Sequence, residues 1–224
     1  MRPGPAVDWA RTRLRDRALD PWIAGRVPRG ARVLDLGCGD GALLQRIERE
    51  RAARGTGIEL DPGAAAEAIA RGLCVAHGDI EAGLRDFAAG TFDVVILNQV
   101  LPLLRDPAAA LETALRLAPL ALVTVPNFAH WRIRLRLGLR GRLPVTAALP
   151  YGWHETPHIR LVTVADFRIL CRERKIGIRG EAFAAIGRRG EPRPVRRLPG
   201  LRAALALFEL EAGPRTRSEW RRCP

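Results

Sequence analysis

The segment Val33–Gly41, VLDLGCGDG, has the residue types and spacing of a loop that holds a small ligand. An apolar run leads directly into Gly37, Gly39 and Gly41. Glycine adopts backbone conformations closed to other residues and lets a ligand approach the main chain closely. The competing interpretation is an ordinary glycine-rich turn. The carboxylate of Asp35, two residues before the first glycine, favours a binding loop and indicates which ligand it holds.

Two ligand classes compete for this loop. Gly37–Ala42 also satisfies the dinucleotide fingerprint G-x-G-x-x-A, and an acid, Glu59, lies 20 residues after Gly39. However, a pyrophosphate about 4 Å from Asp35 would be repelled by several kcal/mol in a partly buried site. A cationic ligand would be attracted. S-adenosylmethionine carries an ammonium and a sulfonium and no phosphate, so we predict that it, or S-adenosylhomocysteine, is the ligand.

Further candidate residues follow the next predicted strands, where open α/β sheets bind their ligands. Glu59 and Leu60 close the second strand, and the Glu59 carboxylate can accept both ribose hydroxyls. Asp79 can accept the adenine amino group while Ile80 packs on the ring, although Asp79 alone is more typical of a helix cap. Asn98 follows the fourth strand, within reach of the methionyl part. The predicted cofactor-binding residues are Asp35, Gly37, Cys38, Gly39, Gly41, Glu59, Leu60, Asp79, Ile80 and Asn98.

The elements that position these residues alternate between strands and helices, which predicts an α/β fold with a mostly parallel sheet. The expected strands are 31–36, 56–60, 73–76, 92–97, 121–125, 176–185 and 204–210. The expected helices are 42–51, 61–72, 107–117 and 164–174, with a loop over 187–200. The run at 92–97 is entirely apolar apart from Asp93, as a strand covered on both faces should be.

The composition fits a soluble domain and excludes several classes. The 224 residues carry a net charge of +13, yet residues 30–125 hold nine basic and thirteen acidic side chains, so the positive charge lies in the flanks. A solvated basic face is the favoured interpretation, and nucleic-acid binding is the weaker one. The four cysteines form no CxxC pair, so no metal site is predicted. With no signal peptide and no membrane segment expected, the predicted location is cytoplasmic.

Residues 30–126 resemble class I S-adenosylmethionine-dependent methyltransferases. The runs 125–146, VPNFAHWRIRLRLGLRGRLPVT, and 148–167, ALPYGWHETPHIRLVTVADF, resemble the MetW family of methionine biosynthesis proteins. The resemblance implies a seven-stranded Rossmann-like sheet with helices on both faces and an insertion after strand five. It also implies a partner, homoserine O-acyltransferase. We expect an N-terminal extension over 1–25, one domain over 26–211 with its insertion at 126–160, and a disordered tail over 212–224.

The insertion holds the residues that the ligand site does not explain. His130, His154 and His158 could face the cofactor, but a surface or capping role is the default for a lone histidine. Trp131, Tyr151 and Trp153 could line a pocket, contact a partner or cover the sheet. Arg132, Arg134 and Arg136 alternate with apolar residues, and we favour a helix whose arginines suit an acidic partner surface.

No acceptor motif for methyl transfer is evident. The [DNS]PP[YFW] motif for amino groups on bases would follow strand four, where this chain has Asn98-Gln99-Val100-Leu101. No catalytic residue is therefore predicted. We favour an S-adenosylmethionine-binding protein of methionine biosynthesis that acts with or regulates homoserine O-acyltransferase. The alternative is an active methyltransferase on an unidentified small-molecule or protein acceptor, and the weaker alternative is a nucleic-acid-associated methyltransferase.

Overall fold

The computed structural model describes residues 17–84, 87–143, 145, 160–187 and 190–213. Its strands are β1 (Arg32–Leu36), β2 (Arg54–Glu59), β3 (Cys74–His77), β4 (Val94–Asn98), β5 (Leu120–Pro126), β6 (Ile176–Ile186), β7 (Pro192–Pro194) and β8 (Leu205–Ala212). They form one sheet in the order β3-β2-β1-β4-β5-β8-β6-β7. The first five are parallel, β8 runs antiparallel to β5 and β6, and β7 runs antiparallel to β6. The predicted α/β fold is confirmed, with eight strands in place of seven.

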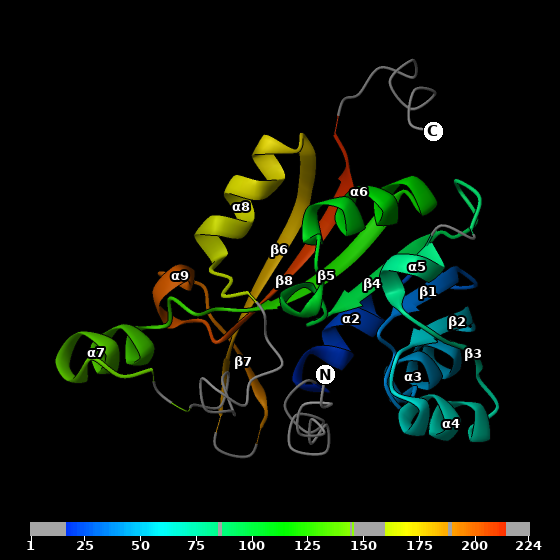
Figure 1. Ribbon diagram of the computed structural model, residues 1–224, viewed down its shortest axis with the longest axis horizontal. Coiled ribbons are helices and arrows are strands. Elements are labelled where there is room, and N and C mark those ends of the chain that lie inside the picture. Colours follow the sequence, from blue (N-terminus) through cyan, green and yellow to red (C-terminus); the bar gives the residue numbers. More distant parts are fainter. Residues whose placement is uncertain (1–16, 85–86, 144, 146–159, 188–189, 214–224) are drawn as a thin grey trace, which may run out of the picture.

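Helices cover both faces of this sheet (Figure 1). The helices of the described residues are η1 (Arg17–Leu19), α2 (Asp20–Arg26), α3 (Ala42–Arg51), α4 (Pro62–Ala70), α5 (Ile80–Gly83), η3 (Leu101–Leu103), α6 (Pro107–Leu117), α7 (Trp131–Arg140), α8 (Val164–Glu173) and α9 (Pro199–Arg202). One core lies under α2 and α3, where Ile23 and Leu44 are fully buried. The other lies under α6 and α8, with Leu111 and Phe167. The strand β4 contributes to both cores, which explains its continuous apolar run.

The region expected as an N-terminal extension contributes to the first core from residue 17 onwards. Leu19, Ile23 and Ala24 are fully buried against the sheet. The guanidinium of Arg26 forms an ion pair with Glu209 at 2.6 Å, which joins α2 to β8. Burial of the two larger side chains, Leu19 and Ile23, stabilises the fold by roughly 1–3 kcal/mol each. Residues 17–26 therefore pack as part of the domain.

The expectation of a loop over 187–200 is wrong in two places. Residues 192–194 form β7, which pairs with β6 from Ile186 opposite Pro192 to Ala184 opposite Pro194, and the short helix α9 follows. Gly190, with a φ of 84°, supplies the left-handed turn between the two strands. The strand was not predicted because prolines usually argue against a strand. Proline is tolerated in a sheet only at an edge such as this one.

The insertion after β5 begins with a buried anchor and continues into a helix that projects from the body of the molecule (Figure 1). The buried amide of Asn127 donates to the carbonyls of Gly200 at 3.0 Å and Ala203 at 2.9 Å. His130 then accepts the Arg132 N–H at 3.2 Å and caps α7. The helix predicted for this stretch is confirmed, and His130 has the capping role expected of a lone histidine.

Other expectations fall outside the described residues. Tyr151, Trp153, His154 and His158 lie there, as do residues 214–224 of the expected tail. Within the described part of the chain, no helix has the length and apolarity needed to cross a bilayer.

Candidate functional site

A cavity of about 410 Å³ opens where β1, β2 and β4 end. Nine of the ten predicted site residues line it: Asp35, Gly37, Cys38, Gly39, Glu59, Leu60, Asp79, Ile80 and Asn98. Gly41 does not line it. A Cβ at Gly41 would lie 2.2 Å from Leu73 Cδ1, so this glycine lets the loop pack against the α4–β3 connection. The strand-end positions predicted from sequence are thus brought together around one space.

The glycine loop owes its shape to left-handed backbone conformations. Gly37 and Gly39 have φ values of 76° and 57°. The N–H groups of Gly37 and Cys38 both donate to the Ile58 carbonyl, at 2.8 and 3.2 Å, which fixes the loop against β2. A Cβ at Gly37 would lie 2.6 Å from Val100, whereas a Cβ at Gly39 would meet nothing within 4 Å. Gly39 therefore borders open cavity space rather than packed atoms.

Glu59 joins the two loops on either side of the cavity. Its Oε2 accepts the Gly39 N–H at 2.7 Å, and its Oε1 accepts the Asp61 N–H at 2.8 Å. A carboxylate has about four acceptor positions, so two remain for hydroxyl donors from a ligand. Asp79 caps α5 by accepting the Glu81 N–H at 2.7 Å. The interpretation of Asp79 as a helix cap is therefore confirmed. Its exposed side chain also lines the cavity.

Asp35 is the deepest carboxylate of the site. It is 1% exposed, and its Oδ1 is buried without a hydrogen-bond partner. Burial raises the pKa of Asp35 to about 8, and the negative charges of Asp20 and Glu59 contribute to the rise. Burial likewise raises the pKa of the neighbouring Cys38 thiol above its usual range, so this cysteine is not a nucleophile at neutral pH.

Sequence reasoning missed Asp20, which enters the cavity from α2. Asp20 is 5% exposed, and its Oδ1 accepts a 3.4 Å hydrogen bond from the Asn98 amide. The amide oxygen of Asn98 in turn accepts from the Thr124 hydroxyl at 2.5 Å. The sequence did contain a signal for the start of a helix at this residue, because Asp20-Pro21 repeats the pair Asp61-Pro62 that begins a later helix.

Arg17 was missed as well, and it stabilises the loop from outside. Its guanidinium forms an ion pair with Asp40, which Arg71 also contacts at 3.1 Å. Burial alone would raise the pKa of Asp40, but the hydrogen bonds from Arg17, the Ala42 N–H and Arg71 hold it below its usual value. Asp40 is therefore an ionised structural group that clamps the loop.

Gln99 lines the cavity and has a left-handed backbone, at a φ of 58°. Unlike the glycines of the loop, it carries a side chain. Its N–H donates to the Thr124 hydroxyl at 2.9 Å and to the Thr124 carbonyl at 3.2 Å, which hold the conformation. Such a backbone costs about 1–2 kcal/mol for a residue other than glycine. No pattern in the sequence predicts this backbone conformation of Gln99.

The cavity is strongly acidic although the chain is basic. Its acidic lining residues are Asp20, Asp35, Asp40, Glu59, Asp61, Asp79 and Glu81, against the two cations Arg17 and Arg105. Among the described residues no cluster of His, Cys, Asp and Glu has a metal-binding arrangement. These carboxylates accept hydrogen bonds and therefore suit an organic cation that also offers hydroxyl and amino donors.

Residues 17–210 match the family of methionine biosynthesis protein MetW. The chain belongs to the MetW family. The match includes residues 17–25, which the sequence analysis had assigned to an N-terminal extension. This MetW-family chain is 32% identical over 213 residues to the bifunctional methionine biosynthesis protein MetXA/MetW of Rhodopirellula baltica. The alignment covers 84% of this chain but 34% of that protein, so the chain spans about a third of that relative's length.

Two further comparisons concern methyltransferases. The MetW-family chain is 28% identical to a ubiquinone biosynthesis O-methyltransferase of Paracidovorax citrulli, over 75% of this chain and 74% of that protein. A solved S-adenosylmethionine-dependent methyltransferase of Thermotoga maritima, described as a possible histamine N-methyltransferase, superposes with a TM-score of 0.64. It is 14% identical, covering 91% of this chain and 92% of that one. At this identity the likeness concerns the fold, which is that of class I methyltransferases.

Proposed function

We propose that this MetW-family chain binds S-adenosylmethionine or S-adenosylhomocysteine and serves methionine biosynthesis together with homoserine O-acyltransferase. The observation that carries the ligand proposal is the acid-lined cavity at the strand ends of a basic chain. Phosphate-bearing cofactors need donors and positive charge at this position. Here the deepest group is the carboxylate of Asp35.

The residues present fit the ligand. Glu59 retains acceptor capacity for the ribose hydroxyls, because its contacts among the described residues are to two backbone N–H groups. Asp79 and Ile80 offer an acceptor for the adenine amino group and an apolar side chain for the ring. Asp35 and Asn98 also line the cavity and would contact the methionyl part. When bound, S-adenosylmethionine supplies an activated methyl group; the residues here bind and orient it.

Titration calorimetry tests the ligand. We expect S-adenosylmethionine and S-adenosylhomocysteine to bind with 1:1 stoichiometry, and NAD to give no heat at the same concentration. Binding of NAD in preference to S-adenosylhomocysteine would show that the glycine loop serves a dinucleotide. Absence of binding by both adenosyl ligands would also overturn the proposal.

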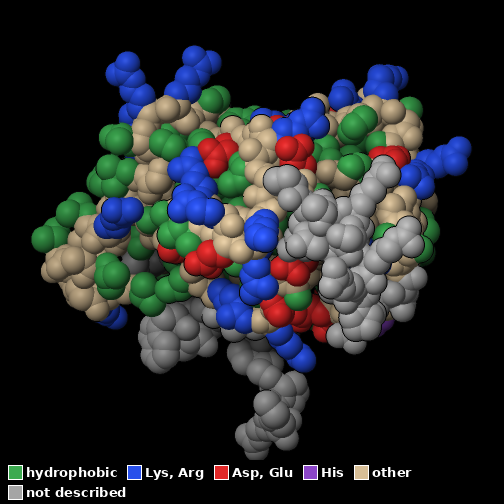
Figure 2. All heavy atoms as spheres, turned by 90° about the horizontal axis from the view of Figure 1, so that it is seen from above, with side chains coloured by type: hydrophobic (Ala, Val, Ile, Leu, Met, Phe, Trp, Pro, Cys, Tyr) green, Lys and Arg blue, Asp and Glu red, His purple; other side chains and the backbone are tan. Residues whose placement is uncertain are grey.

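The partner proposal rests on the relative that joins MetXA and MetW in one chain and on the surface of α7. The apolar stripe of α7 consists of Trp131, Leu135 and Leu139, which are 42%, 50% and 76% exposed. Their spacing of four places them on one side of the helix. Large apolar side chains so exposed on one helix mark an interaction surface. Figure 2 shows hydrophobic side chains at the end of the molecule where α7 projects.

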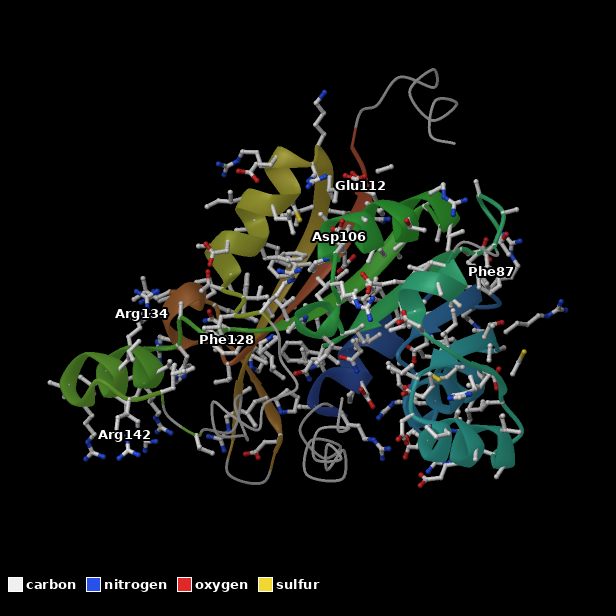
Figure 3. The ribbon with its side chains drawn as sticks, viewed as in Figure 1. Phe87, Asp106, Glu112, Phe128, Arg134 and Arg142 are labelled. Carbon is white, nitrogen blue, oxygen red and sulfur yellow. The ribbon has the colours of Figure 1, made fainter. Side chains whose placement is uncertain are left out.

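An arginine stripe runs beside the apolar one. Arg132, Arg136 and Arg140 share the same spacing of four and are all exposed. Arg134 lies outside this series, donates to the Ala129 carbonyl at 2.7 Å and supports the start of the helix. Within the series, Arg136 donates to the Val145 carbonyl at 3.5 Å. Figure 3 shows Arg134 on the side of α7 opposite to Arg142. We therefore expect the partner to offer an apolar groove bordered by carboxylates.

Association kinetics with homoserine O-acyltransferase test this surface. Replacing Arg132, Arg136 and Arg140 by Gln should slow association at least fivefold at low salt, and the difference should shrink as salt screens the charges. The matched control replaces Arg29, Arg49 and Arg54, exposed arginines on the far half of the sheet, and should associate as the wild type does. Equal slowing in both variants would mean that net charge, not α7, matters. Equal binding of any DNA duplex, with a steep salt slope, would favour the nucleic-acid alternative.

Methyl transfer is the second candidate function, favoured by the 28% identity to an O-methyltransferase over most of both chains. The fold alone does not decide it, because function resides in the site. Incubation with S-adenosylmethionine labelled in its methyl group, with and without homoserine O-acyltransferase, would test it. Stoichiometric labelling of the acyltransferase or of a small molecule would establish transfer.

A further inference from the structure

Two buried carboxylates from the consecutive elements α2 and β1 line the same cavity. Asp20 comes from α2 and Asp35 from β1, and they are 5% and 1% exposed. Both line the cavity, and the charge of Asp20 acts on Asp35. No arginine or lysine contact to Asp35 is present among the described residues, and its Oδ1 has no hydrogen-bond partner.

The sheet explains why the two acids share one space. On the face covered by α2, the buried residues Val33 and Ile96 are followed two positions later by Asp35 and Asn98. Side chains two apart on a strand point the same way, so the face turns from apolar to polar at this level. Asn98 then donates to Asp20 and orients it. The pair is thus a built feature rather than a chance cluster on a loop.

Two carboxylates in one poorly solvated space do not both ionise readily, because each charge raises the cost of the other. The remaining titratable groups of the cavity do not relieve this. Glu59 on β2 adds negative charge and Cys38 stays a neutral thiol. Arg17 is engaged with Asp40. The other lining groups are Asp61, Asp79, Glu81 and Arg105.

We propose that Asp20 and Asp35 hold one proton between them in the ligand-free protein and release it to solvent when the primary ammonium of the ligand enters. This inference rests on the proposed function, since it names the part of the ligand that the acid pair recognises. The ammonium supplies the positive charge and hydrogen-bond donors that the buried Oδ1 lacks. The burial that makes Asp35 resist ionisation is also why its pKa is raised to about 8.

The consequence is that ligand affinity depends on pH with a definite sign. Below the pKa of the pair, each ligand must displace a proton, so the affinity should rise with pH by up to about tenfold per unit. The useful window is about pH 6.0–7.5, because the ligand's own α-amino group, with an ordinary pKa of about 8, is mainly protonated there. Above the pKa of Asp35 the dependence should flatten.

Calorimetry with S-adenosylhomocysteine as the probe measures the proton directly. Titrations at pH 7.0 in phosphate and in Tris, whose ionisation enthalpies differ widely, give the number of protons released per ligand bound. We expect close to one proton for the wild type. Asp35→Asn should release none, and Asp20→Asn should release clearly less, because Asp35 then ionises at lower pH. Asp20→Asn keeps an oxygen that can accept from Asn98, so its fold should survive.

The control Glu173→Gln removes one exposed carboxylate of α8, outside the cavity, and should release as many protons as the wild type. Ligand binding without proton release would overturn this inference and leave the proposed function standing. Equal release by wild type and Asp20→Asn would also overturn it, since Asp20 would then have no part. Absence of any binding by the wild type would overturn both.

Discussion

The guanidinium Nε of Arg160 donates to the main-chain carbonyl of Leu104 at 3.3 Å. Arg160 also donates to the carbonyls of Arg105 and, through its own N–H, of Pro102. Leu104 and Arg105 line the cavity, whereas Arg160 closes the insertion that contains α7. Arg160 is therefore attached to the rim of the candidate ligand site by its side chain and its main chain.

Replacing Arg160 by Met should loosen this rim while keeping the bulk of the side chain. Hydrogen bonds from a charged donor contribute roughly 1.5–3 kcal/mol, of which an exposed group realises the lower part. We expect amide exchange over residues 101–105 to rise severalfold and S-adenosylhomocysteine binding to weaken about threefold to tenfold. Unchanged exchange at the rim would show that Arg160 does not hold it. Arg172→Met, on the exposed side of α8, is the control.

Replacing Glu59 by Ala should weaken ligand binding by roughly 1.5–3 kcal/mol, the usual range for hydrogen bonds to a charged group. The structure adds a second cause, because the same side chain holds the N–H groups of Gly39 and Asp61. Glu59→Gln retains one acceptor oxygen and should lie between wild type and Ala. Calorimetry of the three proteins gives the series, and equal affinities would exclude Glu59 from the site.

Gly39 and Gly41 form a matched pair that separates binding from folding. Both have positive φ values, so a side chain strains both backbones alike. Only at Gly41 would a Cβ collide, at 2.2 Å from Leu73. Gly39→Val should abolish ligand binding with near-wild-type circular dichroism, and Gly41→Val should lower the melting temperature much further. The reverse pattern would contradict the assignment of the loop.

The stability of the ligand-free protein should fall as pH rises from about 5 to 8. Asp35 has its pKa raised to about 8 in the folded protein, so the folded state binds more protons than the unfolded state across this window. Stability is lost wherever that holds. Asp40 and Asp93 have lowered pKa values, so the stability that they contribute is lost only as pH falls into the acidic range. Thermal unfolding of Asp35→Asn should lack this slope, and a slope equal to that of the wild type would refute the prediction.

The features that the sequence allowed us to predict are those with local causes. The glycine loop and the acids after β1 and β2 sit in short motifs whose spacing reflects the turn itself, and nine of the ten predicted residues line one cavity. The helices at 42–51 and 107–117 begin and end as predicted because their apolar spacing is local as well, and Asp106 caps the second of them.

The features that we did not predict depend on contacts between distant segments. Asp20 contacts Asn98, which is 78 positions away in the sequence, and Arg160 contacts Leu104, which is 56 positions away. The local sequence around each residue does not indicate such a contact. The left-handed backbone of Gln99 is imposed by Thr124 on the neighbouring strand. The edge strand β7 was missed because its prolines contradict ordinary strand composition.

The position of β8 has a consequence for the way the chain is made. This strand is formed late in chain order, at residues 205–212, yet it lies between β5 and β6 and pairs with both. During synthesis the apolar strand β5 therefore stays an open edge until the chain as far as Ala212 has left the ribosome. Open apolar edges recruit foreign strands. The nascent chain is thus most exposed to misassembly immediately before its sheet closes.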